Sequence, residues 1–138
     1  MGWVFSLTVI NSSPVNGVTF CQGNFTLMNG DLFPFLRYLL NKNRIFFVHF
    51  RDVIGRKEQF KEIFLDEQGN TNLHKIMKEY VSAGFNGPFR VDHTPLLSGD
   101  RNLMSMPGYS ILGRIDAVGF LKGLYYSTYE ELNQEGGE

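Results

Sequence analysis

Three short apolar stretches of the chain predict strands that are buried inside a domain. They cover residues 18–21, 44–50 and 88–92. Residues 44–50 read RIFFVHF, an almost continuous apolar run that is typical of a strand covered on both faces. The sequence therefore favours a central sheet over a bundle of helices.

A helical pattern follows each predicted strand, over residues 31–40, 71–83 and about 109–131. Asp31 is suited to cap the first helix, and Asn70 or Thr71 the second. Gly84 stands where the second helix is expected to end. Because helices alternate with strands over short links, we predict an α/β fold with a parallel sheet of about three βα units.

The last predicted helix carries an apolar stripe that we expect to face the core. Its positions are Ile111, Leu112, Ile115, Val118 and Leu121. Three glycines interrupt the same helix, at Gly113, Gly119 and Gly123. Each glycine costs about 1 kcal/mol relative to alanine in a helix, so we expect them to mark close packing on a neighbour.

Composition narrows the class of protein. The 138 residues suit one domain, and a formal net charge of −1 argues against a dedicated nucleic-acid binder. No apolar run approaches the ~20 residues that a membrane helix needs. Cys21 is the only cysteine, which excludes an intrachain disulfide and favours a reducing, cytoplasmic location.

Three residues with metal-ligand chemistry stand at the carboxyl ends of the three predicted strands: Cys21, His49 and Asp92. Parallel strands bring these ends to one edge of the sheet, where α/β proteins bind ligands. A thiolate, an imidazole and a carboxylate could share one divalent ion. The alternatives are a small buried hydrophobe for Cys21, a satisfied core histidine for His49, and a cap or ion-pair partner for Asp92.

Further polar residues near the same strand ends are candidates for proton transfer and substrate binding. His93 follows Asp92 directly and could shuttle protons, or it could be a surface histidine. Tyr109 opens the last helix and could donate a proton, or it could simply pack. Arg51 could clamp a substrate carboxylate, or form a solvated charge pair with Asp52. His74 fits a surface position.

Five segments of the chain resemble the mannonate dehydratase family: residues 13–24, 44–53, 84–95, 108–114 and 119–124. The phrases FFVHFRDV and RVDH are together the most specific part of this similarity, which spans about Ser13 to Tyr125. The resemblance implies a TIM barrel that removes water from D-mannonate to give 2-dehydro-3-deoxy-D-gluconate. It also implies a divalent metal, usually manganese, with iron or magnesium as alternatives.

The same resemblance assigns roles to individual residues. Cys21, His49 and Asp92 fall on metal-ligand positions of the family. His93 and Tyr109 fall on its acid/base positions. A metal beside the substrate carboxylate would stabilise the negative charge that develops as the C2 proton leaves, while an acid protonates the departing C3 hydroxyl. The role of Arg51 in substrate binding is our own hypothesis.

The chain departs from the family pattern in three ways. It holds about three of the eight βα units of a barrel, so we expect residues 13–131 to be its C-terminal portion. Residues 1–12 are expected to lie outside the family sequence, and residues 132–138 to form a polar tail. The family's further histidine ligand, on an earlier strand, has no counterpart. Asp116 stands at a usually apolar position, where a buried, unpaired carboxylate would be costly.

These departures predict that the chain is a fragment of a dehydratase whose sheet edges and apolar face lack their normal cover. We expect it to be marginally stable, and to be a homo-oligomer, to complement a missing N-terminal half, or to aggregate. Its predicted partner is the sugar acid D-mannonate, not nucleic acid or membrane. One alternative is a non-catalytic remnant that binds metal or sugar acid or pairs with another chain. Another is a different metal-dependent sugar isomerase on a similar barrel.

Overall fold

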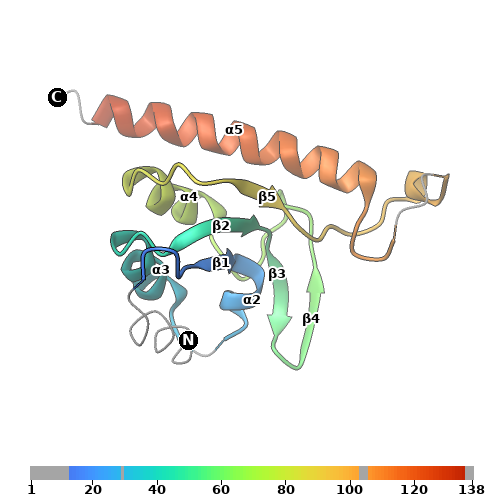
Figure 1. Ribbon diagram of the computed structural model, residues 1–138. Helices are drawn as coiled ribbons and strands as arrows, with labels where there is room; N and C mark the ends of the chain where they lie inside the picture. The colour runs from blue at the N-terminus through green and yellow to red at the C-terminus, as the bar shows by residue number, and fades with distance from the viewer. Residues whose placement is uncertain (1–12, 29, 103–105, 136–138) are drawn as a thin grey trace.

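A computed structural model describes residues 13–28, 30–102 and 106–135 of the chain (Figure 1). The elements are β1 (Val18–Cys21), α2 (Gln22–Thr26), α3 (Leu32–Asn41), β2 (Ile45–Phe50), β3 (Val53–Arg56), β4 (Gln59–Glu62), α4 (Leu73–Ser82), β5 (Phe89–Val91), the 3-10 helix η1 (Ser98–Asn102) and α5 (Ile111–Glu135). None of the described helices is both long enough and apolar enough to cross a membrane.

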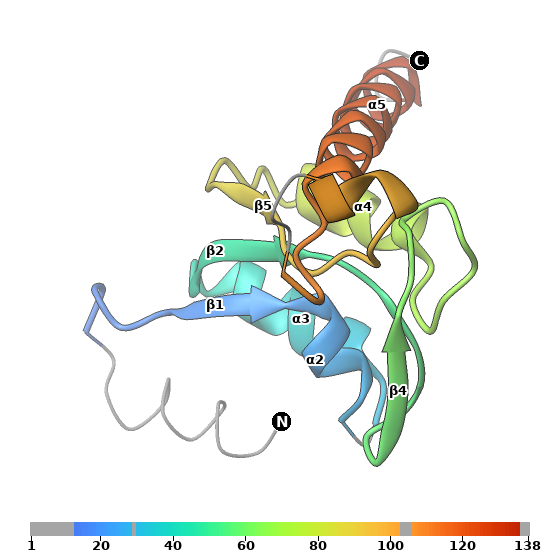
Figure 2. The same cartoon turned by 90° about the vertical axis from the view of Figure 1, so that its right-hand side faces the viewer.

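The three predicted strands form one parallel sheet in the order β1-β2-β5. The register pairs Cys21 of β1 with His49 of β2, and His49 with Arg90 of β5. The α/β class and the parallel sheet are therefore confirmed. All three carboxyl ends lie at one edge of the sheet, which Figure 2 shows where the arrowheads of β1 and β2 point the same way.

The helices begin and end largely where local sequence signals place them. The Asp31 side chain caps α3 by accepting a backbone hydrogen bond of 3.0 Å. Asn72 caps α4 in the same way at 2.8 Å, so the expectation that Asn70 or Thr71 caps this helix is wrong. Gly84 follows α4 with a φ of +65°, a backbone conformation that glycine adopts without steric cost.

One hydrophobic core lies between the sheet and its helices. Its fully buried side chains come from β1, α3, β2 and α4, and include Phe20, Leu36, Leu39, Val48, Phe50, Ile76 and Met77. In β2 the buried side chains are Ile45, Val48 and Phe50, whereas Phe46 is 44% exposed and Phe47 and His49 are only partly buried, so the expectation that this strand is covered on both faces is wrong for the described residues. The core therefore holds fixed the strands whose carboxyl ends carry the polar residues.

An antiparallel hairpin, β3–β4, follows β2 and was not predicted from the sequence. Val53 of β3 pairs with Glu62 of β4 in its register. Asp52 links the two ends of the chain segment that contains this hairpin. Its two carboxylate oxygens accept hydrogen bonds from the backbone N–H of Val53 at 2.8 Å and of Thr71 at 2.9 Å. Burial raises the pKa of Asp52, and these two hydrogen bonds oppose the shift. The hairpin thus has a fixed base beside the end of β2.

The long helix α5 runs alongside α4 and over β5, across the top of Figure 1. It buries a face that overlaps the predicted stripe only in part, since Leu121 packs against the core. Ile111, Ile115 and Val118 are 43%, 66% and 44% exposed, whereas Gly113, Ala117 and Thr128 are buried. The predicted core stripe is wrong at these positions because apolar residues occupy more than one side of the helix. The side with the small residues is the one that packs.

Two further expectations about α5 are corrected in part. Gly113 does pack closely, since an added Cβ would lie 2.8 Å from Ser110 Oγ. Gly119 and Gly123 have no neighbour within 4 Å of such a Cβ, so they do not mark close contacts. Asp116 is exposed, so it carries no burial cost.

The ends of the chain are only partly described. Residues 1–12 lie outside the described part, as do residues 136–138 of the predicted polar tail. Residues 132–135 of that tail belong to α5.

Candidate active site

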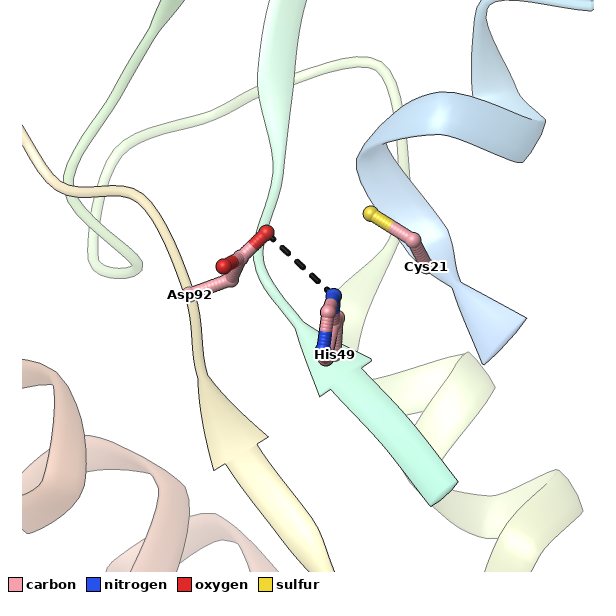
Figure 3. Close-up of side chains that lie close together, drawn as sticks. All are labelled: Cys21, His49 and Asp92. Atoms are coloured by element: carbon pink, nitrogen blue, oxygen red, sulfur yellow. Dashed lines mark ion pairs between the residues drawn. The ribbon is translucent and has the colours of Figure 1, made fainter. Parts of the chain in front are cut away.

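The three predicted metal ligands meet at the carboxyl edge of the sheet. One potential ligand atom from each of Cys21, His49 and Asp92 lies within 4.8 Å of the other two. Figure 3 shows Cys21 at the end of β1, His49 at the end of β2 and Asp92 just after β5, with their side chains converging. His49 Nδ1 lies 3.4 Å from Asp92 Oδ2. The parallel register produces this arrangement because it sets Cys21 directly beside His49.

The donor set fits a divalent cation. Cys21 and Asp92 are each only 6% exposed, so their polar atoms face the cluster rather than bulk water. The His49 ring meets the Phe47 ring edge-on at 5.1 Å between centroids, which restrains its orientation. Sulfur, nitrogen and carboxylate oxygen together suit a borderline transition metal, and a carboxylate also suits manganese or magnesium.

Arg51 lies against this cluster and is buried, at 4% exposure. Its Nε donates to Cys21 Sγ at 3.3 Å and lies 3.4 Å from Asp92 Oδ2. Its Nη2 donates to Asn24 Oδ1 at 2.6 Å, and its Nη1 forms an ion pair with Glu62 Oε1. Burial acts to lower the pKa of Arg51, but hydrogen bonds and charge interactions with Cys21 and Glu62 together outweigh it, so the pKa is raised.

This environment decides between the two interpretations of the Arg51–Asp52 pair. Both side chains are buried, so a solvated charge pair is wrong. Every guanidinium nitrogen of Arg51 has a protein partner. This geometry favours a role in holding the cluster together, and the binding of a substrate carboxylate by Arg51 stays a prediction.

His93 and Tyr109 form a pair beside the cluster. The Tyr109 hydroxyl and His93 Nε2 are 3.0 Å apart, at hydrogen-bond distance, and the same Nε2 lies 3.7 Å from Asp92 Oδ2. Gly108 lets the backbone pass close to the ring: its φ is +78°, and a Cβ there would lie 3.2 Å from His93 Nδ1. The structure thus places a titratable imidazole in contact with a phenol next to the candidate metal ligands.

The position of Tyr109 depends on Asp100 of η1, which is 2% exposed. Its carboxylate accepts hydrogen bonds from Leu97 N at 2.7 Å and from Ser110 Oγ at 2.5 Å. It also accepts bonds from the first two backbone N–H groups of α5, those of Ile111 and Leu112, at 3.0 and 3.2 Å. Asp100 therefore caps α5 and fixes the turn that carries Tyr109.

The structure brings all six predicted site residues into one connected cluster, and it adds residues that the sequence did not indicate. Glu62, at the end of β4, pairs with Arg51 through Oε1 and lies 3.8 Å from His93 Nδ1. No spacing or motif pointed to Glu62, because the hairpin that carries it was not predicted. His74 lies at the surface as expected, 3.2 Å from Glu131 Oε2.

Comparison with known proteins identifies the family. The family model described as D-mannonate dehydratase (UxuA) matches residues 4–135. The chain belongs to this family. The match includes most of residues 1–12, which we expected to lie outside the family sequence.

Individual members of the family support the same assignment. A mannonate dehydratase of Brachyspira hyodysenteriae is 35% identical over 124 residues, which are 86% of this chain and 34% of the relative. Mannonate dehydratase 2 of Halalkalibacterium halodurans is 30% identical over 122 residues. The crystal structure of mannonate dehydratase from Streptococcus suis serotype 2 superimposes with a TM-score of 0.85 at 27% identity, covering 94% of this chain and 37% of that one. This chain spans about a third of the length of the curated relatives that it matches.

Proposed function

We propose that the chain carries part of the active site of an enzyme that dehydrates D-mannonate to 2-dehydro-3-deoxy-D-gluconate. The observation that carries this proposal is the cluster of Cys21, His49 and Asp92 beside a hydrogen-bonded His93–Tyr109 pair. Membership of the D-mannonate dehydratase family supports the choice of substrate. It also favours this reaction over that of a different metal-dependent sugar isomerase.

Cys21, His49 and Asp92 would hold a divalent metal, with manganese preferred and iron or magnesium as alternatives. The metal supplies positive charge that stabilises the charge developing on the substrate carboxylate as the C2 proton leaves. Arg51 keeps the Cys21 sulfur and the Asp92 carboxylate oriented toward each other in the absence of substrate. We retain the hypothesis that Arg51 also binds the substrate. Its guanidinium would then have to release one of its present protein partners.

The His93–Tyr109 pair provides both proton transfers. His93 Nε2 takes the C2 proton, and the Tyr109 hydroxyl gives its proton to the C3 hydroxyl, which leaves as water. The C2–C3 double bond that forms carries a hydroxyl at C2, and this enol tautomerises to the 2-keto product. The proton on Nε2 then passes to the Tyr109 oxygen 3.0 Å away, which restores both side chains.

We propose that the described fold is the C-terminal portion of a TIM barrel, over about residues 13–131. A barrel needs eight βα units, and the described sheet has three strands. β1 and β5 each have one edge without a partner strand among the described residues. Ile115 at 66% exposure and its neighbour Val118 at 44% form an apolar face on α5 that a further element could cover.

A further part of the barrel, or a second copy of this chain, would therefore complete the enzyme. The missing part would also supply the additional histidine ligand that the family resemblance implies. A cytoplasmic location agrees with the single cysteine, Cys21, which is free and buried.

The direct test is a product assay. The purified chain is incubated with D-mannonate and manganese, alone and together with the N-terminal part of a related mannonate dehydratase. We expect 2-dehydro-3-deoxy-D-gluconate to form in the complemented sample. Tyr109→Phe and His93→Asn should each lower that activity by at least about a hundredfold, as expected for the loss of an acid or base. His74→Asn, a surface histidine, serves as the matched control and should leave it unchanged.

The outcomes separate the competing hypotheses. Product from the chain alone would mean that its own copies assemble a working site. Product only in the complemented sample would mean that the cluster is competent but incomplete. No product in either sample, with both parts folded, would refute the proposal and leave the chain as a non-catalytic remnant.

A further inference from the structure

Glu62 occupies a place in the cluster that no step of the proposed reaction explains. It is the last residue of β4, in the hairpin whose base Asp52 closes. Its Oε1 faces two groups, the Arg51 guanidinium and His93 Nδ1. Its Oε2 is buried and has no hydrogen-bond partner among the described residues. A buried carboxylate oxygen with unused acceptor capacity stabilises an N–H donor that can reach it.

The two nitrogens of the His93 ring face different kinds of group. Nδ1 lies 3.8 Å from the Glu62 carboxylate, which can only accept a hydrogen bond when ionised. Nε2 lies 3.0 Å from the Tyr109 hydroxyl, which can donate. Asp92 Oδ2 also approaches Nε2, at 3.7 Å, but it already faces Arg51 and His49 at 3.4 Å each. The partners on the two sides therefore favour a proton on Nδ1 and a lone pair on Nε2.

We propose that Glu62 is a positioning residue that holds the proton of His93 on Nδ1, so that Nε2 accepts the hydrogen bond of Tyr109. The separation of 3.8 Å shortens to that of a charge-assisted hydrogen bond with about 1 Å of side-chain movement. Arg51 Nη1 donates a hydrogen bond to the same Glu62 oxygen, Oε1, which restrains the carboxylate from rotating away from His93. The carboxylate on one ring nitrogen thereby selects the tautomer at the other.

This tautomer has a consequence for the proposed dehydration, and that consequence rests on the proposed function. Nε2 must carry a lone pair at the start if it is to take the C2 proton, and the Tyr109 hydroxyl must keep its hydrogen. A proton on Nε2 would leave His93 unable to act as a base at the atom that faces Tyr109. Glu62 touches neither the substrate nor the metal in this account, so it acts only through His93.

The test measures the tautomer directly, with neither metal nor substrate present. The full chain is labelled with 15N-histidine, and the His93 ring signals are assigned by their loss in His93→Gln. Long-range 1H–15N spectra at about pH 9, where free histidine is neutral, distinguish a protonated ring nitrogen from an unprotonated one. We expect the Nδ1–H form of His93 to be the major one in the unmodified chain.

Three variants distinguish the cause. Glu62→Gln keeps the volume but removes the charge, and should lower the ratio of the Nδ1–H to the Nε2–H form by about tenfold. Glu58→Gln makes the same change at an exposed residue of the same hairpin and should leave the ratio unchanged. Tyr109→Phe should also keep the Nδ1–H form in the majority, because Glu62 and not Tyr109 selects it.

Three results would overturn the proposal: an Nε2–H majority in the unmodified chain, an unchanged ratio in a folded Glu62→Gln chain, or loss of the Nδ1–H form in Tyr109→Phe. The first and third do not depend on whether Glu62→Gln folds. Because no turnover is measured, failure here is distinguishable from failure of the proposed dehydration.

Discussion

Removal of the Asp100 carboxylate should destabilise the chain more than the loss of any single surface charge. In Asp100→Ala, four donors lose their acceptor: Ser110 Oγ and the backbone N–H groups of Leu97, Ile111 and Leu112. Two of these are the first N–H groups of α5, which no residue within the helix can satisfy. The carboxylate also places negative charge at the positive end of that helix dipole.

The expected magnitude is about 3 kcal/mol of unfolding free energy. Loss of a helix cap costs about 1 kcal/mol, and each buried donor left without an acceptor costs about 1–3 kcal/mol. The sum is reduced because the exposed start of α5 admits water: Ile111 is 43% exposed. Asp100→Asn retains one carbonyl acceptor and should cost about half as much. Since whole domains are stable by only about 5–15 kcal/mol, a loss of this size is readily measured.

Urea denaturation followed by circular dichroism, at one fixed protein concentration, provides the measurement. With a slope of about 1–3 kcal/mol per molar urea, Asp100→Ala should lower the midpoint by about 1–3 M. Asp66→Ala, an exposed aspartate, is the matched control and should change stability by less than about 0.5 kcal/mol. If Asp100→Ala costs less than about 1 kcal/mol while Asp66→Ala behaves as expected, the carboxylate does not cap α5 as described.

Two further predictions concern α5. Gly113→Ala should lower the unfolding free energy by about 1–3 kcal/mol, because the new methyl group meets Ser110 Oγ at 2.8 Å. Gly119→Ala should raise the unfolding free energy by about 0.5–1 kcal/mol, because a Cβ there has no neighbour within 4 Å. Thermal unfolding of both variants checks this, and equal effects would contradict it. The hydrogen bond from Lys78 lowers the pKa of Glu131, so the folded chain binds fewer protons there than the unfolded chain and loses this contribution as pH falls below about 5. Glu131→Gln should therefore show a shallower loss of stability in acid than Glu130→Gln, and identical pH profiles would refute this.

The sheet and the site followed from the sequence because one physical rule links them. Short apolar stretches, one of them almost continuous, identified the three strands, and parallel pairing then required their carboxyl ends to meet. Cys21, His49 and Asp92 each stand at such an end, so their convergence needed no knowledge of side-chain packing. The hydrogen bond between His93 and Tyr109 was not predictable in this way, because it depends on how the loop after Asp92 returns to the sheet.

The β3–β4 hairpin could not be predicted because its pattern is not that of a buried strand. Ile54 and Phe60 are 41% and 45% exposed, and the hairpin forms a sheet separate from the parallel one. The turn lacks the Asn-Gly or Asp-Gly pair that marks a tight hairpin. Gly55 was a local signal: its φ is +126°, and a Cβ there would clash with the Gln59 carbonyl oxygen. Glu62 was missed for the same reason.

The buried face of α5 depends on tertiary contacts that helical periodicity does not contain. Its apolar residues lie on several sides, so the stripe through Ile111, Ile115 and Val118 was as well formed as the face that packs. Gly113 and Ala117 decide the outcome, since small side chains let the helix approach its neighbours. The cap of α5 could not be predicted from local sequence either, because Asp100 lies well before Ile111, the first residue of the helix.

The most direct test of the central claim is a titration of the chain with cobalt(II), a spectroscopic substitute for the native metal. The account predicts one ion per chain and an absorption band from bonding between the metal and the Cys21 sulfur, since three protein ligands suffice for a catalytic metal site. Cys21→Ser should abolish the band, His49→Ala and Asp92→Ala should each weaken binding by at least about tenfold, and the surface variant His74→Asn should bind as the unmodified chain does. Binding that none of the three ligand variants weakens, or a sulfur band that persists in Cys21→Ser, would contradict the account.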